Sequence, residues 1–146
     1  YHEGSVWPLF TGWAALANFR YGDYADGMSL MKKNLMLFDD FGLGYAPEVI
    51  NGDVLELIGC PHQGWSSSMA VLPVLKGMAG INVDERNRTI DMHPYLPKDW
   101  NYLRIRNIRC GDDHFDVNLR REGDGIKFDI EGDTKEYKIQ ITPLSG

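Results

Sequence analysis

The sequence has no long hydrophobic run and no segment that looks like an export signal. No apolar stretch approaches the roughly 20 residues that a helix needs to cross a bilayer. No positively charged segment followed by a short hydrophobic one opens the chain, as a signal peptide would require. We therefore expect a soluble protein without a membrane partner. The compartment stays open between the cytoplasm and a periplasmic or secreted location.

The sequence also has little cysteine and no excess of basic residues. Fifteen basic residues stand against 21 acidic ones, which gives a net charge of −6. A field of that sign repels phosphate backbones, so nucleic acid is not expected as a partner. The two cysteines, Cys60 and Cys110, are too few for a disulfide scaffold. The remaining composition, 43% hydrophobic and 25% charged over 146 residues, is that of a globular protein and excludes disorder, collagen and a coiled coil.

The first half of the chain has the period of helices. Over residues 6–20 and again over residues 24–38, apolar side chains recur every three or four positions. Asp23 precedes the second stripe and is expected to cap its helix. A third apolar segment, residues 65–78, predicts a helix that Pro73 should kink, because proline removes a backbone hydrogen bond. Trp13 lies on the first stripe and is expected in the core.

The second half has the period of strands. Apolar and polar residues alternate over residues 115–119, 126–130 and 137–141, and turns rich in Gly and Asp separate these segments. Residues 88–92 and 102–109 are predicted as earlier strands. The pattern indicates an antiparallel meander, which we interpret as part of a small sandwich, and we place the boundary between the halves at residues 80 and 81.

A long connection, residues 39–63, separates the second and third helices. Connections of this length in compact domains are usually functional, so it is the first place to look for chemistry. Within it, Glu48 follows Pro47 and lies near aromatic residues. A carboxylate held by a proline-fixed turn near aromatic rings is what general acid or base catalysis on a sugar requires. From the residues alone, a solvated or capping acid is the commoner role for a carboxylate in such a loop.

Three motifs that follow one another along the chain favour the catalytic interpretation of Glu48. They are residues 1–8 (YHEGSVWP), 47–53 (PEVINGD) and 59–66 (GCPHQGWS). In this order they resemble the C-terminal part of glycogen-debranching-type amylo-α-1,6-glucosidases. The resemblance covers most of residues 1–80 and implies a multi-domain α and β protein. Residues 1–80 would be the last helices of an (α/α)6 barrel catalytic domain, and residues 81–146 would be a C-terminal β-sandwich. Since the chain begins without Met, we expect it to be a piece of a longer protein whose upstream barrel helices pack against it.

The family resemblance implies hydrolysis of α-glucosidic bonds with inversion, by debranching or exo action on an oligo- or polysaccharide. By position, Glu48 matches the general base that takes a proton from the attacking water. Inverting enzymes also need a general acid roughly 6.5–9.5 Å away, across the water. No acid of residues 1–44 lies at a position that matches it, so we expect it upstream of Tyr1 and expect the fragment alone to be inactive. Glu3 stands where the family usually has Asn, which leaves the exact sugar open.

Four residues are candidates for substrate binding. Trp7 and Trp65 could stack on a sugar ring, because an indole can cover the C–H face of a pyranose. His2 and Gln63 could hydrogen-bond sugar hydroxyls. Core packing of the tryptophans, and capping or buried structural bonds of His2 and Gln63, remain as alternatives.

No cofactor or metal is expected, because Cys60 and His62 are too few ligands for a zinc site. Two other functions stay open: a non-catalytic carbohydrate-binding or interdomain module, and a related enzyme of the same implied fold, such as a rhamnosidase or a phosphorylase. On the β half, a sugar-binding sheet is disfavoured by the absence of an aromatic cluster and by four arginines that we expect to face outward: Arg104, Arg106, Arg120 and Arg121.

Overall fold

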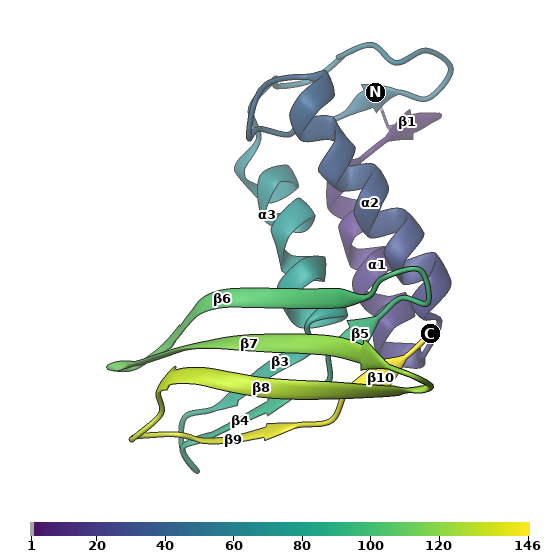
Figure 1. Ribbon diagram of the computed structural model, residues 1–146. Coiled ribbons are helices and arrows are strands. Elements are labelled where there is room, and N and C mark those ends of the chain that lie inside the picture. Colours follow the sequence, from purple (N-terminus) through teal and green to yellow (C-terminus); the bar gives the residue numbers. More distant parts are fainter. Residues whose placement is uncertain (1) are drawn as a thin grey trace. The chain divides into compact units, whose positions relative to one another are not determined.

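The computed structural model describes residues 2–146, and these form two compact units (Figure 1). One unit ends at Gly77 and the other begins at Met78, three residues before the boundary expected from the sequence. The first is mainly helical and the second is built of strands.

Within residues 2–77 the structure has three α-helices, joined to a short π-helix that ends at residue 78. They are α1 (Pro8–Tyr21), α2 (Tyr24–Asp40), α3 (Gly64–Leu72) and the π-helix η1 (Pro73–Met78). All three expected helices are therefore present. The regular α-helix of the third segment ends at Pro73, because proline has no N–H to continue the hydrogen-bond ladder.

A two-residue link joins α1 to α2. Gly22 has a φ of 87°, a left-handed conformation that glycine adopts without strain. The N–H groups of Gly22 and Asp23 donate to the carbonyls of Phe19 and Asn18, at 3.3 and 2.9 Å, which closes the end of α1. The carboxylate of Asp23 then accepts the N–H of Asp26 at 3.4 Å and caps α2, as the sequence predicts.

One buried amide ties the three helices together. Asn34 on α2 is 2% exposed, and its Nδ2 donates to the carbonyl of Pro8 at 2.8 Å and to the carbonyl of Met69 at 3.2 Å. In a regular α-helix the Met69 carbonyl would accept the N–H of residue 73, but residue 73 is proline. Asn34 therefore supplies the donor that Pro73 lacks.

Small residues let these helices approach closely. The buried face of α1 consists of Pro8, Gly12, Ala15 and Phe19. A Cβ on Gly12 would lie 2.4 Å from the Cβ of Met69, so only glycine fits there. Trp13, expected in the core, is 52% exposed. That expectation is wrong because the buried side of α1 is its small-residue side and not the stripe of large apolar side chains.

A short antiparallel pair joins the start of the chain to the long connection. Strand β1 (Ser5–Val6) pairs with β2 (Ile50–Asn51), with Val6 opposite Ile50. In Figure 1 this pair and the connecting loop lie at the end of the unit where α1 and α3 begin and α2 ends. The second and third sequence motifs are therefore brought to the start of α1.

The second unit, residues 78–146, contains two three-stranded sheets and one two-stranded sheet in the described structure. The strands are β3 (Ile81–Asp84), β4 (Thr89–Met92), β5 (Tyr95–Leu96), β6 (Tyr102–Cys110), β7 (Asp113–Glu122), β8 (Gly125–Asp133), β9 (Lys138–Ile141) and β10 (Leu144–Ser145). Strands β6, β7 and β8 form an antiparallel sheet. Strand β4 pairs antiparallel with β3 and parallel with β9, and β5 pairs parallel with β10.

Alternate residues of β7 build the core of this unit. Phe115, Val117 and Leu119 are at most 1% exposed, and they form one cluster with Ile90 and Met92 of β4. The intervening residues of β7 are half-buried or exposed, which is the period of two that the sequence shows. The predicted strands at residues 115–119 and 126–130 are thus confirmed within β7 and β8.

The register of β6 against β7 shifts once, at a bulge between Ile105 and Ile108. Asn107 in the bulge has a φ of 54°, a conformation that asparagine tolerates better than most residues. Its N–H donates to the Asp116 carboxylate at 2.9 Å. This hydrogen bond is the main reason that the pKa of Asp116 is lowered, so the carboxylate stays ionised and holds the bulge.

The predicted fold class is wrong. Across residues 2–146 the structure shows three α-helices and small sheets, and these helices do not form part of an (α/α)6 barrel. The β unit is also not a purely antiparallel sandwich, because β4–β9 and β5–β10 pair in parallel. The barrel was implied by a resemblance of three short motifs, and short motifs do not determine how many helices pack around them.

Arg121 is a second correction. Its guanidinium turns inward and donates to the carbonyls of Leu96, Pro97 and Trp100, at 3.0, 2.8 and 3.3 Å. The neighbouring Arg120 is exposed, as expected. Arg121 has the same strand parity as the buried residues of β7, which the polar character of arginine concealed in the sequence.

Candidate functional site

Glu48 lies in an irregular hairpin whose arms are residues 46–51 and 56–63. The N–H of Glu48 donates to the carbonyl of Cys60 at 2.8 Å, and the N–H of Gln63 donates to the carbonyl of Ala46 at 3.0 Å. Around Glu48 the first arm is buried, with Pro47 and Val49 almost inaccessible, whereas Glu48 itself is half-buried. The hairpin thus presents one carboxylate from an otherwise buried arm.

The two oxygens of this carboxylate differ in their contacts. Oε2 accepts the N–H of Cys60 at 3.1 Å, so the side chain is fixed by the same residue that pairs with its backbone. Oε1 accepts no hydrogen bond from any residue that the structure describes. One oxygen is therefore anchored and the other remains able to accept a hydrogen bond from solvent or a ligand.

Glycines make this close pairing possible. A Cβ on Gly59 would lie 2.5 Å from Val49 Cγ1 and 2.9 Å from Glu48 Oε2, so a larger residue would displace the carboxylate. A Cβ on Gly52 would lie 1.9 Å from the Gly4 carbonyl oxygen, where the start of the chain crosses the hairpin. The three sequence motifs therefore meet in one place; Tyr1, which opens the first motif, lies outside the described residues.

The expected substrate-binding residues have different surroundings. The rings of His2 and Trp7 stack, with centroids 5.6 Å apart and planes within 2°, just before α1. Trp65 is 45% exposed on the first turn of α3. Gln63 precedes that helix, and its Oε1 accepts the N–H of Gly64 at 3.1 Å, so its oxygen serves as a helix cap.

The sequence reasoning missed a second stacked pair. The rings of Tyr45 and His62 lie 4.4 Å apart with an interplanar angle of 24°, and both residues are exposed. Tyr45 directly precedes the first arm of the hairpin and His62 lies on the second arm, so the two rings come from different sides of the hairpin. In the sequence the only signal was an aromatic ring close to each proline, with Tyr45 two residues before Pro47 and His62 directly after Pro61.

Neither a metal centre nor a membrane segment is found in the described residues. No group of three or more His, Cys, Asp or Glu side chains among residues 2–146 is arranged to hold a metal ion. Cys60 and His62 are joined differently, since the Cys60 thiol donates to the His62 carbonyl at 3.4 Å. Over the same residues, every helix is too short or too polar to cross a bilayer.

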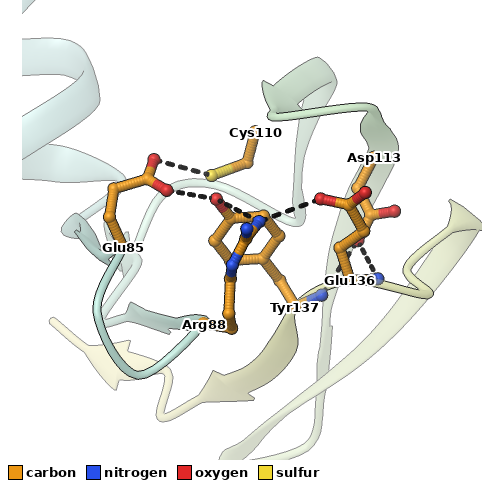
Figure 2. Close-up of polar contacts among 6 residues, drawn as sticks. All are labelled: Glu85, Arg88, Cys110, Asp113, Glu136 and Tyr137. Carbon is orange, nitrogen blue, oxygen red and sulfur yellow. Dashed lines mark hydrogen bonds and ion pairs between the residues drawn. The ribbon is translucent and has the colours of Figure 1, made fainter.

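A second polar cluster lies in the β unit (Figure 2). The hydroxyl of the buried Tyr137 donates to Glu85, and the Cys110 thiol lies 3.9 Å from the other oxygen of Glu85. Arg88 lies over the Tyr137 ring and pairs with Glu136 at 3.0 Å. The hydrogen bond to Glu85, assisted by Cys110 and by burial, raises the pKa of Tyr137.

This cluster fixes two connections of the β unit. Asp113 Oδ2 accepts the N–H groups of Glu136 and Tyr137 at 2.8 and 3.0 Å, which pins the segment before β9 to the start of β7. Glu85 and Arg88 belong to the turn between β3 and β4. The polar groups are engaged with one another, so the cluster is a structural tie and the hairpin around Glu48 is the candidate site.

No protein-family model matches the chain, and no curated protein matches it. The likeness to debranching-type glucosidases therefore rests on the three motifs, and the function has to be argued from the site.

Proposed function

We propose that this chain carries the water-activating carboxylate of an inverting glycoside hydrolase that acts on α-glucosidic bonds by debranching or exo action. The observation that supports this best is the state of Glu48. Its Oε2 is held by the Cys60 N–H, while its Oε1 has no partner in the described structure. A general base needs this combination, because it must be fixed in place and still accept a proton.

In the proposed reaction, Glu48 takes a proton from a water molecule as the water oxygen bonds to the anomeric carbon. The glycosidic C–O bond breaks on the opposite face, and its oxygen receives a proton from a general acid. No acid of residues 1–44 matches the general acid that the resemblance implies, so the proposal requires one from outside these 146 residues. Cleavage of an α-glucoside by this route releases the β-anomer.

Aromatic rings near the hairpin suit a sugar substrate. Trp65 is about half exposed on α3, and Trp7 lies directly after β1, which pairs with the strand that follows Glu48. An indole covers the C–H face of a pyranose without requiring charge. His2, stacked on Trp7, brings ring nitrogens that can bond hydroxyl groups.

The test is Glu48→Gln in the full-length protein, assayed on α-1,4- and α-1,6-linked gluco-oligosaccharides. Glutamine keeps the size of the side chain and can accept the Cys60 N–H, but it cannot take up the proton of water. We expect kcat to fall by roughly 10²–10⁴-fold with folding and KM nearly unchanged. NMR of the first wild-type product should show the β-anomer.

The matched control is Glu56→Gln, which changes an exposed carboxylate in the other arm of the same hairpin. It should leave turnover unchanged. Near-normal hydrolysis by the Glu48→Gln variant would overturn the assignment. Binding of gluco-oligosaccharides without any hydrolysis by the full-length wild type would favour a non-catalytic carbohydrate-binding module instead. The 146-residue chain alone should release no glucose, since it lacks the acid.

A further inference from the structure

We infer that Tyr45 and His62 form a carbohydrate-stacking surface beside Glu48, which takes a glucosyl ring of an α-gluco-oligosaccharide. This inference deepens the proposed function and rests on it. The two rings stack on one another at 4.4 Å, and Tyr45 remains 52% exposed. A stacked pair leaves one outer face on each ring, and such a face is what the apolar side of a pyranose needs.

The pair is held in place before any ligand arrives. The N–H of Tyr45 donates to the carbonyl of Gly42 at 2.9 Å, which closes a turn on the Tyr45 side. On the other side, the His62 carbonyl accepts the Cys60 thiol at 3.4 Å, and the next residue, Gln63, pairs with Ala46. Rings that are already ordered lose little conformational entropy on binding, so the surface is preorganised.

The pair also lies within reach of Glu48. Tyr45 is three residues from Glu48, which limits the separation of their Cα atoms to about 10 Å. His62 lies on the opposite arm, two residues from the Cys60 N–H that anchors the carboxylate. A di- or trisaccharide can span such a distance, so one glucosyl unit can rest on the rings while a glycosidic bond approaches Glu48.

The charge of the chain segment that carries the pair favours a neutral ligand. Residues 34–75 contain no lysine or arginine but five acidic residues, which are Asp39, Asp40, Glu48, Asp53 and Glu56. A nucleotide or another phosphorylated ligand could stack on the rings, but this segment offers no lysine or arginine for its phosphate. A neutral sugar has no such requirement, and its hydroxyl groups can bond to the imidazole of His62.

The experiment uses the full-length Glu48→Gln protein, which binds without cleaving, and titrates it with maltotriose and with isomaltotriose. Adding Tyr45→Ala should raise Kd about tenfold for the oligosaccharide that binds, because stacking area is lost. Adding Tyr45→Phe should restore affinity, since it keeps the ring. In the active protein, Tyr45→Ala should raise KM similarly and leave kcat within about twofold.

The matched control is Tyr21→Ala, which removes an 88% exposed tyrosine of the same unit at the other end of α1. It should change neither Kd nor KM. Equal affinities for the Tyr45→Ala and Tyr21→Ala proteins would overturn the inference, even if Glu48→Gln abolishes turnover. Conversely, binding that depends on Tyr45 in a protein with no hydrolytic activity would refute the proposed function and keep the stacking surface.

Discussion

The two units place their apolar side chains in opposite ways. Among the described residues, 14 of the 17 large apolar side chains that remain exposed belong to the helical unit and three to the β unit. Phe10, Trp13 and Tyr21 on α1 are each more than half exposed, whereas the inward residues of β7 are at most 1% exposed apart from the half-buried Arg121 and the 4% exposed Asp113. The β unit closes its own core, and the helical unit keeps apolar surface available.

The two units therefore differ in role: the β unit has the closed core, and the helical unit carries the candidate site. The helical unit is tied by small residues and by the amide of Asn34, while Phe10, Trp13 and Tyr21 of α1 face outward. Exposed apolar and aromatic surface of this kind is typical of regions that bind a ligand or a partner. The candidate site lies in the helical unit. In the β unit, the polar groups of the cluster around Tyr137 bond to one another and hold the turns in place.

The sharpest test compares two phenylalanines. Phe115→Ala in the core of β7 should lower the free energy of unfolding by about 3–5 kcal/mol, because it leaves a cavity among buried neighbours. Phe10→Ala on α1, where the ring is 53% exposed, should cost less than about 1 kcal/mol. Urea unfolding followed by far-UV circular dichroism measures both. Similar losses would mean that the helical unit is packed as tightly as the β unit.

A smaller effect is expected for the amide that ties the helices. Asn34→Ala should cost about 1–3 kcal/mol, since the buried hydrogen bond to the Pro8 carbonyl and the partly buried one to the Met69 carbonyl are lost. Pro73→Ala restores an N–H at the position where a regular helix would supply one. The cost of Asn34→Ala should therefore be smaller in the Pro73→Ala background, and a double-mutant cycle measures that coupling. Lys33→Ala, an exposed neighbour on α2, serves as the control. Equal costs of Asn34→Ala in both backgrounds would refute the donor role.

Much of the local structure could be predicted because it follows from local physics. The cap at Asp23, the interruption of the third helix at Pro73 and the strands in β7 and β8 depend on residues close together in the sequence. The interruption was expected as a kink, whereas the α-helix ends there and continues as a π-helix. The buried face of α1 could not be found in this way. Close helix packing selects glycine and alanine, so Gly12 and Ala15 are buried while the larger Trp13 is exposed.

The candidate site was partly predictable. Glu48 was visible from its motif, and the hairpin that anchors it explains why Gly59 and Cys60 accompany it. The Tyr45–His62 stack was missed because it depends on the pairing of two arms, and that register is a long-range property. The parallel pairing of β9 with β4 was missed for the same reason: alternation shows which side of a strand is buried but does not name its neighbours.

The smallest expected effect concerns the polar cluster around Tyr137 in the β unit. In the folded chain the pKa of Tyr137 is raised above its ordinary value of about 10, chiefly by its hydrogen bond to Glu85. The stabilisation is therefore complete below pH 10 and is lost as pH rises, because the unfolded chain releases this proton first. Tyr137→Phe should lower Tm by roughly 2–5 °C at neutral pH and flatten the decline above pH 10. Tyr102→Phe, at a tyrosine that is 72% exposed, should do neither. Thermal unfolding from pH 7 to pH 11 measures these differences, and an unchanged alkaline slope in Tyr137→Phe would show that this hydroxyl does not govern the loss of stability.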